Sequence, residues 1–254
     1  MAGRTSVDLH VKVLNEAVVA RANAADIDVL VYAPHFTHLD EVRERAARFS
    51  DEELLVVPGR EYFTGTWSNR KHVLAVDPDY PVPDFLPLDV VMAELADQDA
   101  GVLVPHPEFL TMSMAWPDIE TYRDRVDAVE VYNPKHLPWH NRRAREIARE
   151  SELPTYLSSY AHLAPTVGDV WVEFEREIES AADLVAALQE PAPRRMFHRD
   201  GLLHALKCRA EFAHLAWENT WEKFDRVALS GREATHPAGP GYDDRFADLN
   251  AYRP

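Results

Sequence analysis

The sequence predicts an α/β fold in which short buried strands alternate with amphipathic helices to give a barrel-like, mainly parallel layout. Three observations support this prediction. Apolar runs of strand length recur along the chain, as expected for strands buried on both faces. Segments with helical apolar spacing separate them. Several runs stop at a proline that is closely followed by a histidine or a glutamate, and α/β barrels collect their ligands at the carboxyl ends of their strands.

The first elements can be justified in chain order. Residues 6–13 alternate well enough for a strand, and residues 15–25 have helical apolar spacing without a breaker. Residues 28–33 are an apolar run that Pro34 stops, so a second buried strand is expected there. Residues 39–49 place apolar side chains on one stripe and charges on the other, which is typical of a helix packed on a sheet.

The next strand, residues 54–57, is stopped by Pro58 and Gly59 and leads to Glu61. The remaining strands are expected at residues 71–76, 101–104, 128–132, 155–159 and 170–174. Further helices are expected at residues 88–95, 139–150, 181–188 and 201–228. Such repeated strand–helix alternation is typical of a barrel-like parallel sheet.

The pattern predicts three regions along the chain. We expect an α/β barrel over residues 1–195 and a C-terminal helical extension over residues 196–229 that packs on the barrel. The extension carries an aromatic stripe that we expect to face the barrel, consisting of Phe212, Trp217, Trp221 and Phe224. Gly, Pro and Asp dominate from residue 230, so residues 230–254 are expected to form a flexible tail.

Composition narrows the class of protein. The chain has 254 residues and a net charge of −16, which argues against a broad basic surface for nucleic acid. Cys208 is the single cysteine, so an internal disulfide and a thiolate cluster are excluded and a metal would need nitrogen and oxygen ligands. No apolar run is long enough for a membrane span, and no signal peptide is recognised, so we expect a cytoplasmic protein without a membrane partner.

Polar side chains beside the predicted strands form the most informative set. It consists of His10, His35, Glu61, His72, His106 and His162. A single histidine beside a strand is usually an ordinary hydrogen-bonded residue, but six such positions on separate segments favour a shared metal site at one barrel mouth. Imidazole and carboxylate ligands suit Zn, Mn or Fe. The other histidines lie in loops, at helix starts or outside the barrel pattern, and we assign them no metal role.

An ordered series of segments resembles the polymerase-and-histidinol-phosphatase (PHP) superfamily over roughly residues 6 to 190. The segments are DLHVK, VLVYAPH, VPGREY, KHVLAV, VPHP, VEVYN and SSYAH. The resemblance implies a distorted (β/α)7 TIM-like barrel and metal-dependent phosphoesterase activity. It also implies that Glu61 bridges two metals, that His72 and His106 complete the second position, that His10 contributes to the first, and that His35 and His162 contribute to the third.

The chain departs from the family pattern at four ligand positions. The acidic or histidine ligand expected in the loop after the first strand is absent, and Glu16 is the nearest carboxylate there. Lys12 replaces the second histidine of the opening motif, Pro34 replaces an aspartate before His35, and Tyr160 stands where an aspartate precedes the last histidine by two residues. The second metal position stays intact. An ammonium at residue 12 would repel a dication but would hold a phosphate by point charge.

Three hypotheses follow from these residues. The first is a phosphoesterase with a reduced metal site, in which a metal at Glu61, His72 and His106 activates water. In this hypothesis Lys12, Arg60 or Arg70 would steady a small phosphorylated substrate, and Asp8 would orient His10. The second is a catalytically degenerate protein that binds a phosphorylated ligand or a partner, as Lys12 and Tyr160 suggest. The third is an amidohydrolase, which shares strand-end histidines on a related barrel.

Overall fold

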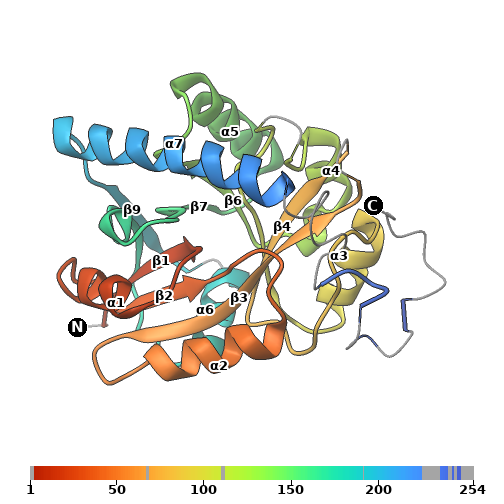
Figure 1. The fold of residues 1–254 in the computed structure, drawn as a ribbon, viewed down its shortest axis with the longest axis horizontal. Helices are drawn as coiled ribbons and strands as arrows, with labels where there is room; N and C mark the ends of the chain where they lie inside the picture. Colours follow the sequence, from red (N-terminus) through yellow and green to blue (C-terminus); the bar gives the residue numbers. More distant parts are fainter. Residues whose placement is uncertain are drawn as a thin grey trace.

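The computed structural model describes residues 3–66, 69–109, 112–190, 192–224, 235–239, 242 and 245–246. Within this part, nine strands form one nearly closed, mixed sheet in the order β7-β6-β5-β4-β3-β2-β1-β8-β9 (Figure 1). The strands are β1 (Thr5–Val11), β2 (Val29–Tyr32), β3 (Leu55–Thr64), β4 (Lys71–Val76), β5 (Gly101–Val104), β6 (Ala128–Tyr132), β7 (Thr155–Leu157), β8 (Val170–Phe174) and β9 (Arg194–His198). The predicted distorted α/β barrel is therefore confirmed.

The sheet is mixed because β4 and β8 run against their neighbours. β4 is antiparallel to both β3 and β5, and β8 is antiparallel to both β1 and β9, whereas β1, β2 and β3 are parallel, as are β5, β6 and β7. The connection between β3 and β4 is too short for the crossover that a parallel pair needs. The start of β4 consequently lies beside the end of β3, with His72 opposite Phe63.

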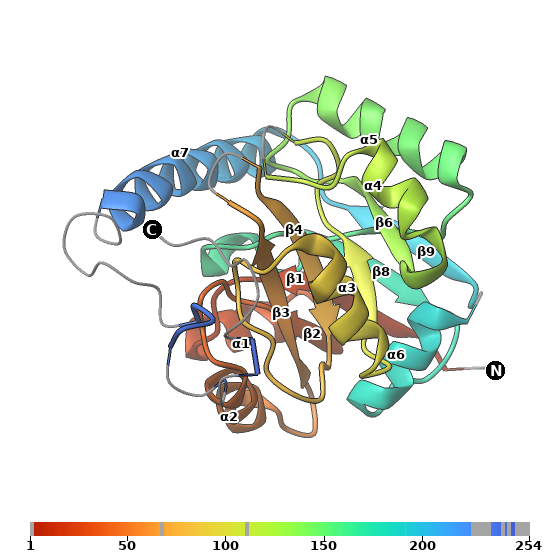
Figure 2. The same ribbon diagram turned by 90° about the vertical axis from the view of Figure 1, so that its right-hand side faces the viewer.

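Helices surround the sheet on its outside (Figure 2). They are α1 (Glu16–Asn23), α2 (Leu39–Phe49), α3 (Leu88–Ala96), α4 (Trp116–Thr121), α5 (Pro138–Ser151), α6 (Ala181–Gln189) and α7 (Leu202–Phe224), with the 3-10 turns η1 (Arg123–Arg125) and η2 (Ala164–Thr166). The predicted stripe of α2 buries Leu39, Val42 and Ala46. The Asn15 side chain accepts a hydrogen bond from the Val18 N–H and so caps α1, as expected for asparagine at this position.

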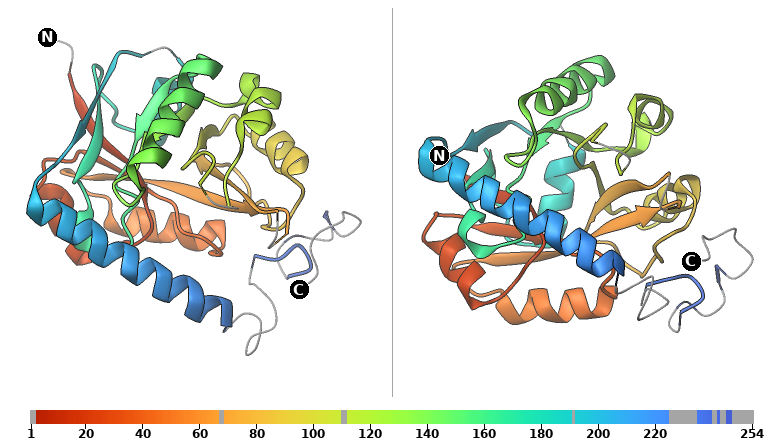
Figure 3. Two further views of the ribbon diagram at one scale, coloured as in Figure 1. Left: turned by 90° about the horizontal axis from the view of Figure 1, so that it is seen from above. Right: turned by 45° about the horizontal axis from the view of Figure 1, so that its top comes forward.

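The long helix α7 crosses one side of the barrel and contacts η2 (Figure 3). Two residues of the predicted aromatic stripe do not face the barrel, because Phe212 is 51% exposed and Trp217 is 62% exposed. The side chains of Trp221 and Phe224 lie outside the described part of the chain. Instead, Cys208 and Glu211 are buried. None of the described helices is both long and apolar enough to cross a membrane.

Most of residues 230–254, expected to form a flexible tail, lies outside the described residues. Several of the described ones are buried. The Thr235 hydroxyl donates a hydrogen bond to Asp84, and Tyr242 and Phe246 join the apolar cluster that includes α3 and β5. Burial of the two aromatic rings explains why this part of the segment is packed despite its glycine and proline content.

Candidate metal-binding site

The candidate site is built around the carboxylate of Glu61, which β3 carries and which is fully buried. His72 Nδ1 lies 3.1 Å from Oε1 of this carboxylate, and His106 Nε2 lies 2.9 Å from the same oxygen. On Oε2, His35 Nε2 lies at 2.9 Å and His10 Nε2 at 3.3 Å. The Lys12 ammonium also makes an ion pair with Oε2. Five of the predicted residues thus meet on one carboxylate.

The sheet explains how residues so far apart in sequence come together. His10 lies near the end of β1, and His35 and His106 follow the ends of β2 and β5. His72 lies at the start of β4 and reaches the same mouth because that strand runs in the opposite direction. His106 has a left-handed backbone, with φ 35°, and its own N–H donates to Glu130 at 2.7 Å. These constraints hold the His106 imidazole toward Glu61.

Tyr160 and His162 complete the mouth from the loop after β7. The Tyr160 ring lies 4.9 Å from the His10 ring, 5.5 Å from the His106 ring and 4.9 Å from the His162 ring, measured between centroids. His162, the last of the predicted ligands, contacts the Tyr160 ring. It is not among the described side chains that contact Glu61 directly.

Burial and mutual charge set the protonation of this cluster. Burial lowers the pKa of His10 to about 3 and that of His35 well below its ordinary value. Both imidazoles are consequently neutral near pH 7, the form that binds metals. Burial alone would raise the pKa of Glu61, but the Lys12 ammonium holds it well below the ordinary value. Burial lowers the pKa of Lys12 to about 8, against the attraction of Glu61.

Two residues predicted to act in catalysis lie elsewhere. Arg60 and Glu61 are neighbours on β3, so their side chains leave opposite faces of the strand. The Arg60 guanidinium donates to the Pro34 carbonyl at 3.0 Å and to Asp84 at 2.8 Å. Asp8 accepts the N–H groups of Ser159 and Gly168 at 3.0 and 3.1 Å. Both side chains hold parts of the scaffold together, and neither is among the groups that contact Glu61. Asp8 also contacts the backbone of His10, the residue that we expect it to orient.

Three buried residues beside the cluster had no recognisable signal in the sequence. Lys135 follows β6, and its Nζ lies 4.6 Å from the centroid of the Tyr160 ring. Glu211 of α7 lies 3.4 Å from that Nζ. The Ser113 hydroxyl forms a hydrogen bond with His106 Nδ1 at 2.9 Å, and this bond orients the imidazole. A single lysine, glutamate or serine in a loop or an amphipathic helix looks the same in sequence whether it is solvated or buried.

The donor set fits one divalent ion. His35, Glu61 and His72 each offer a ligand atom, and these atoms all lie within 4.8 Å of one another. His106 contacts the same carboxylate and would add a further nitrogen. Among the described residues, buried His72 Nε2 has no hydrogen-bond partner, while the other ring nitrogen, Nδ1, faces Glu61. The Lys12 ammonium, however, holds Oε2, so the residues do not fit a second ion on that side of the carboxylate.

Comparisons with known proteins agree with this architecture. A family model described as PHP-associated matches residues 138–193. No curated protein matches the sequence. Among solved structures, PsfC from Pseudomonas syringae PB-5123 shares 17% identity with a TM-score of 0.61, covering 84% of this chain and 99% of that chain.

Two further solved structures share the fold. The lesion-specific endonuclease PfuEndoQ from Pyrococcus furiosus has 12% identity and a TM-score of 0.55, covering 76% of this chain and 58% of that chain. An amidohydrolase from Chromobacterium violaceum with bound sulfate and no metal has 13% identity and a TM-score of 0.50, covering 64% of this chain and 89% of that chain. At these identities the likeness concerns the fold.

The fold and the Glu61 cluster define a distorted α/β barrel with histidines and a carboxylate at its mouth. A model of a PHP-associated family matches residues 138–193, and the fold is similar to that of the PHP superfamily, which the order of the motifs resembles.

Proposed function

We propose that this chain is a metal-dependent phosphoesterase that binds one divalent ion through Glu61, His72 and His106, with His35 beside them. The observation that carries the proposal is the convergence of four imidazoles and one ammonium on a single buried carboxylate. The nitrogen and oxygen donors suit Zn, Mn or Fe. An ion bound there would polarise a phosphoryl oxygen and lower the pKa of a water molecule.

Lys12 has a defined part in this proposal. Its ammonium replaces the positive charge of a second ion beside Glu61, and it would attract a phosphoryl oxygen by point charge. A phosphate ester carries one or two negative charges, whereas an amide carries none at the reacting group. The lysine therefore favours phosphate-ester hydrolysis over an amidohydrolase reaction. The net charge of −16 favours a small phosphorylated substrate over a nucleic acid.

The same contact supports a second candidate function. The Lys12–Glu61 ion pair partly satisfies the buried carboxylate without a metal, so the mouth would also suit a phosphorylated ligand that is bound and not hydrolysed. The two functions differ in whether the Glu61 cluster takes up a metal and whether the bound ester turns over.

The test is hydrolysis of p-nitrophenyl phosphate and bis-p-nitrophenyl phosphate after loading with Mn²⁺ or Zn²⁺. We expect turnover that a chelator abolishes and that Glu61→Gln lowers at least 100-fold. Glu173→Gln is the matched control, because Glu173 is a partly exposed carboxylate on β8 that pairs with Arg4. Turnover that survives both the chelator and Glu61→Gln would contradict the proposal. Tight binding of inorganic phosphate without metal or turnover would favour the second function.

A further inference from the structure

Helix α7 places one buried carboxylate against the loop that borders the candidate site. Glu211 is fully buried although its neighbour Phe212 is half exposed. Its Oε1 accepts the backbone N–H of His162 at 2.6 Å and that of Leu163 at 2.8 Å. Hydrogen bonds from N–H groups to an ionised carboxylate are roughly twice as strong as neutral ones. Glu211 therefore fixes the backbone of this loop from a helix 49 residues further along the chain.

The loop that Glu211 fixes carries Tyr160 and His162. Tyr160 has a left-handed backbone, with φ 48°, which costs a non-glycine residue about 1 kcal/mol or more unless its surroundings hold it. Its ring contacts the rings of His10, His106 and His162. A shift of this loop would consequently move a side chain that touches three ligand candidates, His10, His106 and His162.

The second oxygen of Glu211 faces Lys135. The distance from Oε2 to Nζ is 3.4 Å, and both side chains are almost completely buried. The Lys135 Nζ also lies over the Tyr160 ring at 4.6 Å from its centroid, a cation–π contact. Glu211 thus links α7 to the loop after β6 as well as to the loop after β7.

We infer that Glu211 is a positioning residue of the Glu61 site and that α7 is part of that site. By binding two N–H groups and the Lys135 ammonium, Glu211 holds Tyr160 and His162 at the barrel mouth. The role of the site is taken from the proposed function, whereas the hold on the loop depends only on the contacts of Glu211.

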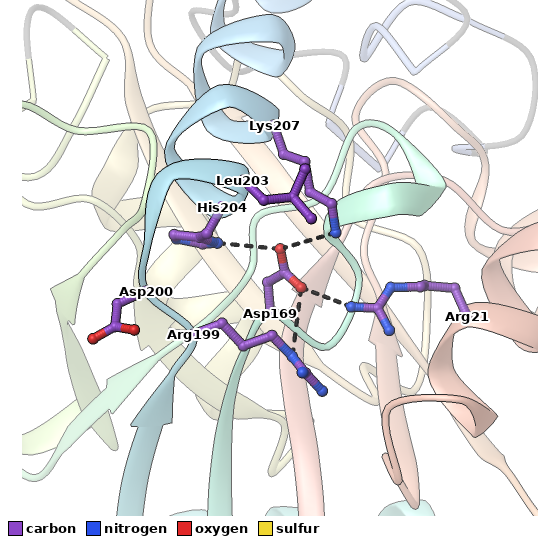
Figure 4. A pocket seen from close by; sticks show the side chains of 7 residues that line it. All are labelled: Arg21, Asp169, Arg199, Asp200, Leu203, His204 and Lys207. Carbon is purple, nitrogen blue, oxygen red and sulfur yellow. Dashed lines mark hydrogen bonds and ion pairs between the residues drawn. The ribbon is translucent and has the colours of Figure 1, made fainter.

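A separate cluster attaches the first turns of α7 to the barrel. Asp169, which is 1% exposed, accepts His204 Nδ1 at 3.1 Å and lies 3.7 Å from Lys207 Nζ, and Arg21 and Arg199 approach the same carboxylate (Figure 4). Removing Glu211 should therefore leave α7 in place. Lys207→Ala is a matched control, because Lys207 contacts Asp169 and the Pro165 carbonyl, at 3.7 and 3.0 Å, and none of residues 160–163 is among these partners.

The experiment compares Glu211→Ala, Glu211→Gln and Lys207→Ala by three measurements. These are amide hydrogen exchange of the 160–163 loop, Co²⁺ binding followed by its absorption spectrum, and kcat and KM for p-nitrophenyl phosphate. Exchange and Co²⁺ binding do not require turnover, so they test Glu211 even if the proposed activity is wrong. Glu211→Asp, which shortens the side chain by one methylene group, gives a milder test if the alanine variant does not fold.

We expect Glu211→Ala to speed exchange at His162 and Leu163 at least tenfold, to change the Co²⁺ spectrum, and to lower kcat at least tenfold while KM changes less than threefold. Glu211→Gln keeps a carbonyl oxygen for the two N–H groups. Its exchange rates and kcat should therefore lie within threefold of those of the unaltered chain. Lys207→Ala should behave as the unaltered chain. Unchanged exchange in Glu211→Ala would overturn the inference. So would faster exchange that leaves the Co²⁺ spectrum and kcat unchanged, because Glu211 would then be structural only.

Discussion

Replacing Lys12 by methionine should strengthen metal binding while it weakens the metal-free protein. Methionine keeps much of the length of the lysine stem but removes the ammonium that pairs with Glu61 Oε2. Two unit charges about 4 Å apart interact by about 4 kcal/mol at an effective dielectric constant near 20, and a dication would double this value. Relaxation of the site will reduce the effect. We therefore expect divalent-ion affinity to rise by at least 100-fold, or about 2.7 kcal/mol.

Without metal, the same substitution should lower the stability of the folded protein. It leaves the Glu61 carboxylate with one ion-pair partner fewer in a buried site, and loss of one partner from a buried ion pair costs about 3–5 kcal/mol of unfolding free energy. Metal at 100 times its dissociation constant adds about 2.7 kcal/mol to the unfolding free energy. Lys12→Met should thus unfold at lower temperature than the original chain without metal, and gain more thermal stability when metal is added.

Calorimetric titration with Mn²⁺ or Zn²⁺ measures the affinity, and thermal unfolding with and without metal measures the stability. Lys207→Met controls for the loss of a lysine far from Glu61. If Lys12→Met binds metal no more tightly than the original chain does, the ammonium does not compete with the ion, and the electrostatic argument is refuted.

Three other predictions concern charge and burial. Because Lys12, with its pKa lowered to about 8, loses its proton as pH rises, metal affinity should increase from pH 7 to pH 9 more steeply in the original chain than in Lys12→Met; equal slopes in calorimetry would contradict this. Asp84→Ala removes the carboxylate partner of the buried Arg60 and should cost about 3–5 kcal/mol of unfolding free energy in urea with metal content unchanged, whereas a loss below 1 kcal/mol would argue against a scaffold role. Burial raises the pKa of the Cys208 thiol to about 11, so a thiol reagent at pH 8 should react with it slowly until the chain unfolds, and fast reaction of the folded chain would disprove its burial.

The sequence predicts the barrel and the Glu61 cluster because both depend on strong local patterns. Buried strands appear as apolar runs, and a histidine or glutamate at the end of such a run has a defined place in the fold. His72 shows the limit of this reasoning, since its position near a strand start reaches the mouth only because β4 is antiparallel to β3. The strand β9 was not predicted because its five residues, RRMFH, include no buried position.

Side-chain direction is what the sequence leaves open. Arg60 and Glu61 are adjacent and both charged, yet one faces Asp84 and the other faces four histidines. The aromatic residues of α7 suggested its inward face, but Phe212 is exposed and Glu211 is the residue that reaches the barrel. A buried carboxylate on a helix is unusual because burial is costly without partners. Its partners, the N–H groups of His162 and Leu163, become visible only when the chain is folded.

The number of divalent ions bound per chain tests the central claim most directly. Elemental analysis after loading with Zn²⁺ or Mn²⁺ and removal of excess metal should find one ion per chain, and none in Glu61→Gln. No bound ion in the original chain, or an ion that remains in Glu61→Gln, would contradict a metal site built on this carboxylate.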